Sequence, residues 1–455
     1  MTGRRPFADL PSRRGMVIVL VSSFAAACAP VLSPTPRVNA PRAKNCAFKG
    51  GRWFDGSGYR PRQYYAVDGM FTTREPRQID EVIDLGDNYV IPPFADAHTH
   101  HFDNPANIDK HIAMYLKDGV FYAKVQTDVR SRARRVAAKV NIPGSVDISY
   151  AHGGLSATNG HPLATYEGLA LLGRPGPRPG DVQRVRDSRL VDNDAYYIID
   201  TAADLDAKWS AILAGKPDFI KLYLIHSEEY DERKRRTDSV GDRGLDPALV
   251  PSIVRRAHRA GLRVSAHVTT AADYRVALAA GVDEMAHLPG SSIPENADPA
   301  EYELSDEDAK RTAERGIWVI PAPAYYPMFD PQNPAYDAAA KARTENIRIR
   351  NLQRLRRHHV RIAFGSDSFG RSPVKDVLYL NTLGVFSNLE MLKIWCEDTP
   401  RTIFPQRRIG RLEAGYEASF LALTGDPLAD LSQVRSIRLR YKQGDLLLPG
   451  LFPPT

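Results

Sequence analysis

The stretch Phe94-Ala-Asp-Ala-His98-Thr-His100 decides the fold, because a short apolar strand ends there in two histidines. Residues two apart on a strand point to the same side, so both imidazoles can reach one ion. His101, the next residue, points the other way and is not expected to be a ligand. Because an isolated His-x-His pair is more often incidental, its meaning depends on the rest of the chain.

Apolar runs typical of strands alternate with helical stretches after residue 93. Helical periodicity is clear at 249–260 and 271–280. Strands that alternate with helices indicate a parallel sheet. We therefore expect an α/β protein whose residues 93–404 form a (β/α)8 TIM barrel. The eight candidate strands begin at Phe94, Val120, Val146, Phe219, Leu262, Val282, Ile317 and Arg361.

Short strands broken by turns lie on both sides of this region. We expect residues 46–92 and 405–455 to pair into one small composite β-sandwich. Cys46 and Cys396 allow a disulfide in an oxidising compartment, but their spacing does not show that they meet.

Residues 1–27 have the pattern of an export signal, in which four arginines precede an apolar run and small residues. Ala25-Ala-Ala-Cys28 resembles a bacterial lipobox, which predicts a signal peptide of the lipoprotein type with Cys28 as the lipid-bearing first residue. The alternative is an uncleaved N-terminal anchor helix. Both interpretations place the chain outside the cytoplasm, in the periplasm or cell envelope and attached to the membrane. The proline-rich residues 28–45 predict an extended tether.

The charge of the chain argues against a nucleic-acid partner. The formal net charge is +7, part of which lies in the N-terminal arginines, and the remainder is spread along the chain. The pattern gives no indication of an oligomeric state.

Ligand-capable side chains fall at the ends of the predicted barrel strands. Lys221 lies in the fourth strand, His267 and His287 end the fifth and sixth, and Asp367 follows the eighth. The carboxyl ends of barrel strands meet at one rim, so we expect these side chains to converge with His98 and His100. Each alone has an ordinary explanation, such as a core histidine or a helix cap at Asp367. Their common position favours a metal centre.

These segments resemble the amidohydrolase superfamily, in its imidazolonepropionase and prolidase-like branch, over residues 46–450. The resemblance rests on Phe94–His100, on Asp218-Phe-Ile-Lys221, Val264-Ser-Ala-His267, Asp283-Glu-Met-Ala-His287 and Phe364-Gly-Ser-Asp367, and on the tail from Ile409. It implies a hydrolase that cleaves a C–N bond in an amide, dipeptide or cyclic amide with a metal-bound hydroxide.

The resemblance also implies one or two divalent ions, with zinc expected. His98, His100 and Asp367 would hold one ion, and His267 and His287 the other. Lys221 would bridge them as a carbamate, and Asp367 would be the catalytic residue that takes a proton from the hydroxide. If Lys221 is an ordinary strand lysine, a one-metal site remains.

Two further residues are candidates for binding a small-molecule or dipeptide-like substrate. His161 lies in a loop that resembles a Thr-Gly-Gly-His loop of the family, and Tyr223 lies two residues after Lys221 on the same side. An exposed loop histidine and a packed strand tyrosine are the plainer explanations. Residues 162–194 and 321–329 are candidate lids.

Three other functions stay open. They are an amine deaminase with a one-metal site, a phosphotriester or lactone hydrolase, and a non-catalytic envelope lipoprotein that uses the barrel for binding.

Overall fold

The computed structural model describes residues 44–447, apart from 292, 324–330 and 335. The predicted signal peptide, Cys28, nearly all of the predicted tether and most of the candidate lid at 321–329 lie outside the described residues. Within the described part, no helix combines the length and the apolar character that a membrane span requires.

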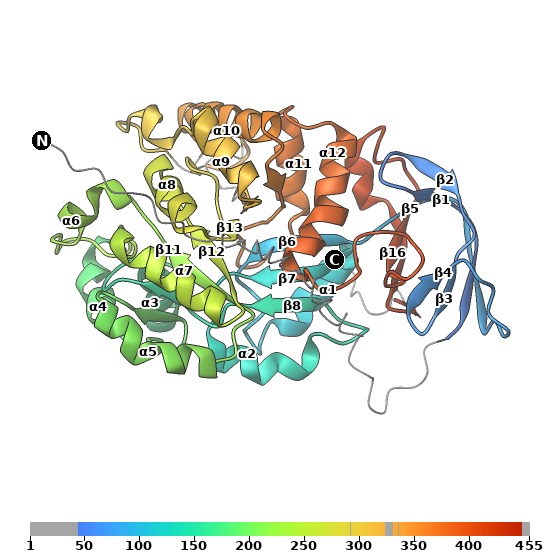
Figure 1. Cartoon of the computed structure of the whole chain (residues 1–455), viewed down its shortest axis with the longest axis horizontal. Coiled ribbons are helices and arrows are strands. Elements are labelled where there is room, and N and C mark those ends of the chain that lie inside the picture. Colours follow the sequence, from blue (N-terminus) through green and yellow to red (C-terminus); the bar gives the residue numbers. More distant parts are fainter. Residues whose placement is uncertain (1–43, 292, 324–330, 335, 448–455) are drawn as a thin grey trace, which may run out of the picture. The chain divides into compact units, whose positions relative to one another are not determined.

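Strands from the two ends of the described chain form one mixed sheet, in the order β18-β17-β16-β5-β1-β3-β4 with β2 paired to β1. In Figure 1, β1 to β4 (blue) lie in the same sheet as β16 (red). β5 pairs in parallel with β1 and antiparallel with β16. The strands are β1 Cys46–Phe54, β2 Tyr59–Pro61, β3 Tyr65–Val67, β4 Met70–Thr72, β5 Glu81–Ile91, β16 Phe420–Leu423, β17 Ile437–Lys442 and β18 Asp445–Leu446.

The pairing of the two end segments agrees with the sequence, but the predicted sandwich is not confirmed. Among the described residues these strands make a single sheet, not two packed ones. Aromatic rings from both segments pack together on it, with Phe48 5.0 Å from Phe420 and 5.1 Å from Tyr441 between ring centroids. Aromatic rings from the two ends of the described chain therefore bury one another on this sheet, as part of the main hydrophobic core.

The middle of the chain forms parallel strands with helices between them (Figure 1). One sheet has the order β6-β7-β8, and the other has the order β10-β9-β11-β12-β13-β14-β15. The strands are β6 Phe94–Thr99, β7 Val120–Val125, β8 Asp147–Tyr150, β9 Gly154–Ser156, β10 Tyr196–Ile198, β11 Phe219–Tyr223, β12 Arg263–His267, β13 Glu284–Met285, β14 Trp318–Val319 and β15 Arg361–Ile362.

The strand order is that of a TIM barrel, but the predicted single closed sheet is not found. The third strand is split into β8 and β9, because His152 and Gly153 between them have φ of 52° and 102°, which interrupts a ladder. Backbone contacts at and beside the strand ends join the two sheets. The Asp218 amide donates to the Tyr150 carbonyl (2.9 Å), the Ala97 amide donates to the Phe364 carbonyl (2.8 Å), and Thr99 bridges Ser368.

Helices follow most of the parallel strands. The predicted helical stretches are confirmed as α7 and α8, and α8 begins at a capping box made by Thr270 and Asp273. The α-helices are α1 Ile108–Lys117, α2 Arg130–Val136, α3 Leu163–Leu172, α4 Val182–Asp187, α5 Ala202–Ala214, α6 Tyr230–Arg233, α7 Val250–Arg259, α8 Ala271–Ala280, α9 Asp306–Glu314, α10 Ala338–Arg357, α11 Val374–Thr382, α12 Asn388–Lys393 and α13 Thr399–Ile403, with a π-helix η7 at Ile394–Asp398.

Two buried ion pairs connect strands in the interior of the fold. The Lys124 ammonium lies 2.6 Å from the Glu284 carboxylate, and the Lys442 ammonium lies 2.8 Å from Asp147 of β8. The second pair joins the mixed sheet to the parallel strands. Cys46 and Cys396 are both buried and free, so the structure has no disulfide between them.

Candidate functional site

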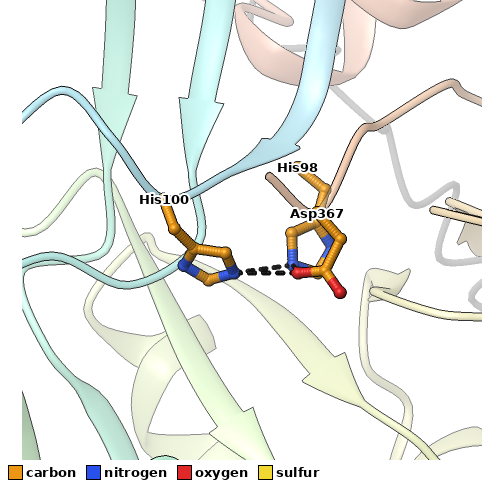
Figure 2. Close-up of side chains that lie close together, drawn as sticks. All are labelled: His98, His100 and Asp367. Atoms are coloured by element: carbon orange, nitrogen blue, oxygen red, sulfur yellow. Dashed lines mark hydrogen bonds and ion pairs between the residues drawn. The ribbon is translucent and has the colours of Figure 1, made fainter. Parts of the chain in front are cut away.

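Three of the predicted ligands lie together where β6 ends and beyond the end of β15. The Nε2 atoms of His98 and His100 lie 3.2 Å and 3.1 Å from Oδ1 of Asp367, and 3.2 Å from each other (Figure 2). Their ligand atoms all lie within 4.8 Å of one another. Two imidazoles and a carboxylate at this spacing can share one cation.

The backbone of β6 holds this group in place. The carbonyl of His98 accepts the amides of Ser366 (3.0 Å) and Asp367 (2.7 Å). Asp367 has a φ of 50°, a left-handed conformation that aspartate tolerates better than most residues. The loop after β15 is thereby turned so that its carboxylate meets the two imidazoles.

Asp96, two residues before His98, ties the two segments together. Its Oδ1 accepts the amides of His98 (3.1 Å) and Ser366 (3.0 Å), and its Oδ2 accepts the hydroxyls of Ser366 and Tyr115, each at 2.7 Å. Asp96 is fully buried. The sequence marked it only as part of a strand, although a buried acid beside two histidines is a usable signal.

The other two predicted metal-ligating histidines, His267 and His287, lie next to these three residues. The ring of His287 lies 4.6 Å from that of His98 and 4.3 Å from that of His267, measured between centroids. His267 ends β12, and His287 follows β13. The expectation that strand ends converge is thus met in space for all four histidines.

Lys221 lies in the middle of β11 with its ammonium fully enclosed. The side chain has no exposed surface, and among the described residues its Nζ has no hydrogen-bond partner. Its Nζ lies 5.2 Å from the ring centroid of Tyr223. Burial lowers the pKa of Lys221 to about 7, against the pull of the Asp367 carboxylate. An amine in this state is partly neutral near physiological pH and can act as a nucleophile toward CO2.

The two predicted substrate residues lie next to the metal-ligand candidates. The His161 ring is 4.9 Å from that of His267 and 5.0 Å from that of Tyr223. The Tyr223 hydroxyl makes a short hydrogen bond to the Thr127 hydroxyl. Burial lowers the pKa of His161 to about 4, so its imidazole is neutral at physiological pH.

The protonation states suit cation binding. Burial lowers the pKa of His98 to about 3 and also lowers those of His267 and His287. Burial would raise the pKa of Asp367, but His98 and His287 hold it well below its ordinary value. Neutral imidazoles beside an ionised carboxylate are the forms in which these side chains bind metals.

Unpartnered polar atoms indicate that the residues fit a metal centre. Among the described residues, the buried Nδ1 atoms of His98 and His287 and the Nζ of Lys221 have no hydrogen-bond partner. Buried polar groups are normally paired, so their concentration here is unusual. A set of imidazole nitrogens and carboxylate oxygens suits zinc and similar divalent ions.

Two contacts of His100 were not predicted from the sequence. The Tyr166 hydroxyl, on α3, donates to the Thr127 carbonyl (2.6 Å) and lies 3.3 Å from Nδ1 of His100. The Phe369 ring stacks on His100 with 4.9 Å between centroids, and 43% of Phe369 is exposed. For Phe369 the sequence signal was its place two residues after Asp367, whereas nothing in the sequence indicated Tyr166.

His101 lies apart from the group, in agreement with the alternation of side chains on a strand. Its Nδ1 lies 2.9 Å from the Ser368 carbonyl and its ring lies 4.6 Å from that of His111. It joins the segments that carry the site without facing the ligand candidates.

Comparisons with solved structures show that this chain shares its fold with known proteins. No protein-family model and no curated protein sequence matches the chain. Solved structures do: an amidohydrolase is 19% identical over 88% of this chain and 98% of its own, with a TM-score of 0.65. The ochratoxinase of A. niger is 18% identical over 89% and 96%, with a TM-score of 0.66. A Xaa-Pro dipeptidase with bound methionine is 16% identical over 88% and 99%, with a TM-score of 0.64.

Proposed function

We propose that this chain, which has the fold of the amidohydrolases, is a metal-dependent hydrolase of C–N bonds in small amides, dipeptides or cyclic amides. Structures with this fold include an ochratoxinase, a Xaa-Pro dipeptidase and a phenylurea hydrolase. The observation that carries the proposal is the convergence of His98, His100 and Asp367 within 3.2 Å of one another beside the buried Lys221.

The metal ligands in this proposal are the three clustered residues for one ion and His267 and His287 for a second. Lys221, as a carbamate, would supply an anionic oxygen to each ion, which accounts for an ammonium buried without a partner. A divalent ion in such a site makes water acidic enough to be a nucleophile near neutral pH and polarises a carbonyl.

In this proposal the side chains of the site transfer protons and orient the substrate. The Asp367 carboxylate, which stays ionised beside His98 and His287, can take a proton on one oxygen and pass it to a leaving amine. His161, neutral at physiological pH, can donate a hydrogen bond to a substrate carbonyl or carboxylate from its N–H. The Thr127 contact fixes the Tyr223 hydroxyl at the same side of the site.

The test compares metal content and activity in matched histidine variants. His100 and His358 each place Nε2 3.1 Å from an aspartate oxygen, but only His100 belongs to the site. We expect His100→Ala to lose bound metal and hydrolysis of a dipeptide and cyclic-amide panel, while His358→Ala keeps both. Equal metal content in the two variants and the unaltered protein would refute the proposal.

The number of ions distinguishes the remaining alternatives. About two divalent ions per chain, reduced in Lys221→Ala, support the carbamate-bridged site. One ion that is unchanged in Lys221→Ala, with release of ammonia from amine substrates, would instead identify a deaminase. Metal binding without any turnover that depends on Asp367 would leave a binding protein.

The N-terminal pattern supports a second, separate proposal: the chain is exported and anchored by lipid on Cys28. Cells that express the tagged chain should incorporate labelled fatty acid into it and retain it in the membrane fraction. Cys28→Ser should abolish the label; label that persists in this variant would contradict the proposal.

A further inference from the structure

A cavity lies at the opposite ends of the strands that carry the metal-ligand candidates. It measures about 750 Å³ and is lined by residues at or before the starts of β12 to β15, among them Arg263, Asp283, Trp318 and Arg361. His267 ends β12, and His287 and Asp367 follow the ends of β13 and β15, on the other side of the fold. The cavity is therefore separate from the candidate metal centre.

The cavity has an excess of positive charge. Its lining includes four arginines and two aspartates, with His258 beside them. Both aspartates have partners. Asp283 accepts the Val264 amide (2.7 Å) and lies 2.9 Å from His258, and Asp398 lies 3.6 Å from Arg401. The excess of arginine is thus not balanced within the cavity.

Two of the arginines are held by close polar contacts, whereas the other two, Arg361 and Arg401, have none shorter than 3.6 Å among the described residues. Arg263 donates to the Thr402 carbonyl (2.7 Å) and lies 3.0 Å from Glu284, and Arg315 donates to carbonyls at the end of α8. Within the part of the chain that the structure describes, the ion pairs of Arg401 are long, 3.6 Å to Asp398 and 3.8 Å to Glu397.

Arg361 is the least constrained of the four. It is exposed, and within the described part of the chain no hydrogen bond or ion pair of its guanidinium is found. The guanidinium lies 5.7 Å from the centroid of the Trp318 ring, which is itself partly exposed. The charge of Arg361 also acts on the Asp398 carboxylate, but at a distance beyond an ion pair, so the cavity combines a loosely held guanidinium with an aromatic wall.

We propose that this cavity binds a small organic dianion, with its charged end on Arg361 and Arg401 and its apolar part against Trp318. Guanidinium groups bind phosphate and carboxylate groups through paired hydrogen bonds. The volume is in the range of small-molecule sites and far exceeds that of a bare ion. The shared chemistry is that of a phosphate monoester or a dicarboxylate.

The test is calorimetric titration of the full protein with phenyl phosphate, with phthalate and with neutral benzyl alcohol. We expect a Kd of about 1 mM or tighter for at least one dianion and none for the alcohol. The double variant Arg361→Gln/Arg401→Gln should weaken this binding about tenfold or more, since charge-assisted hydrogen bonds are lost. Arg74→Gln/Arg438→Gln, which removes the same charge from two exposed arginines elsewhere, should not.

The outcomes separate this site from the metal centre. Loss of binding in the cavity variant alone upholds the proposal, and the tighter of the two anions identifies the ligand as a phosphate ester or a dicarboxylate. Binding that is lost in His100→Ala but kept in the cavity variant would place the anion at the metal centre and overturn the proposal. Equal weakening in both arginine double variants, or absence of binding by either anion, would also overturn it.

Discussion

Replacing Lys124 with methionine should lower the free energy of unfolding by about 2–3 kcal/mol at pH 7. Lys124 and Glu284 lie 2.6 Å apart, and their side chains are only 2% and 1% exposed. Removing one partner of a buried pair typically costs ~3–5 kcal/mol, because the other charge stays buried. We expect a smaller loss here because Glu284 keeps the Thr402 hydroxyl (2.7 Å) and Arg263 (3.0 Å).

The same ion pair also predicts how the free energy of unfolding changes with pH. Burial would raise the pKa of Glu284, but Lys124 and Arg263 hold it at about 2, below its ordinary value of 4.5. The carboxylate therefore contributes stability that is complete above pH 4.5 and is lost as the pH falls toward 2. That shift corresponds to about 3 kcal/mol for all its partners together. The difference between the unaltered protein and Lys124→Met should accordingly shrink over this range.

A second lysine provides the matched control. Lys139 also lies 2.6 Å from a carboxylate, that of Asp109, but the two side chains are 47% and 76% exposed. Lys139→Met should change the free energy of unfolding by less than about 0.5 kcal/mol. Urea unfolding followed by circular dichroism measures both variants. Equal losses in the two variants, or a Lys124→Met deficit that stays constant from pH 7 to pH 3, would refute the reasoning.

Three further outcomes concern the site. Tyr166→Phe removes one of two contacts on Nδ1 of His100 and leaves the Thr127 carbonyl at 3.2 Å, so it should weaken metal affinity by up to about tenfold in a competition titration; unchanged affinity would count against a role of Tyr166 in orienting the ring. Asp96→Asn replaces the carboxylate that accepts the His98 and Ser366 amides and should cost about 10–100-fold in the same titration, whereas a loss confined to thermal stability would make Asp96 purely structural. Dialysis against a chelator should lower the melting temperature, and re-addition of zinc should restore it; an unchanged melting temperature would contradict a site that binds metal in the folded state.

The positions of the metal-ligand candidates could be predicted because they depend on one geometric rule. Parallel strands that follow each other in the chain bring their carboxyl ends together, so His267, His287 and Asp367 needed only the right place in each strand. No contact had to be known in advance. Lys221 lies in the middle of its strand, so its role was indicated by the resemblance to the amidohydrolases and not by this rule.

The contacts that the sequence did not predict depend on tertiary packing. Tyr166 belongs to α3, in the stretch predicted only as a lid, and nothing in its local pattern shows that this helix lies beside His100. The split third strand arises from backbone angles at His152 and Gly153, which apolar periodicity does not encode. A sandwich could be predicted only by knowing how the strands of the two end segments pair, which the sequence does not give. In the structure the described strands of these segments lie in one sheet.

The pairing of β5 with β16 also bears on how the chain acquires its fold. Leu421 and Ala422 pair with Ile91 and Val90, and most of the chain lies between these partners. During synthesis from the N-terminus, β1 to β5 emerge early and lack this neighbour until β16 has been made. Contacts at such long range also slow folding once the chain is complete. The nascent protein must therefore pass through a stage in which the β5 edge of its first sheet is open and able to pair with other chains.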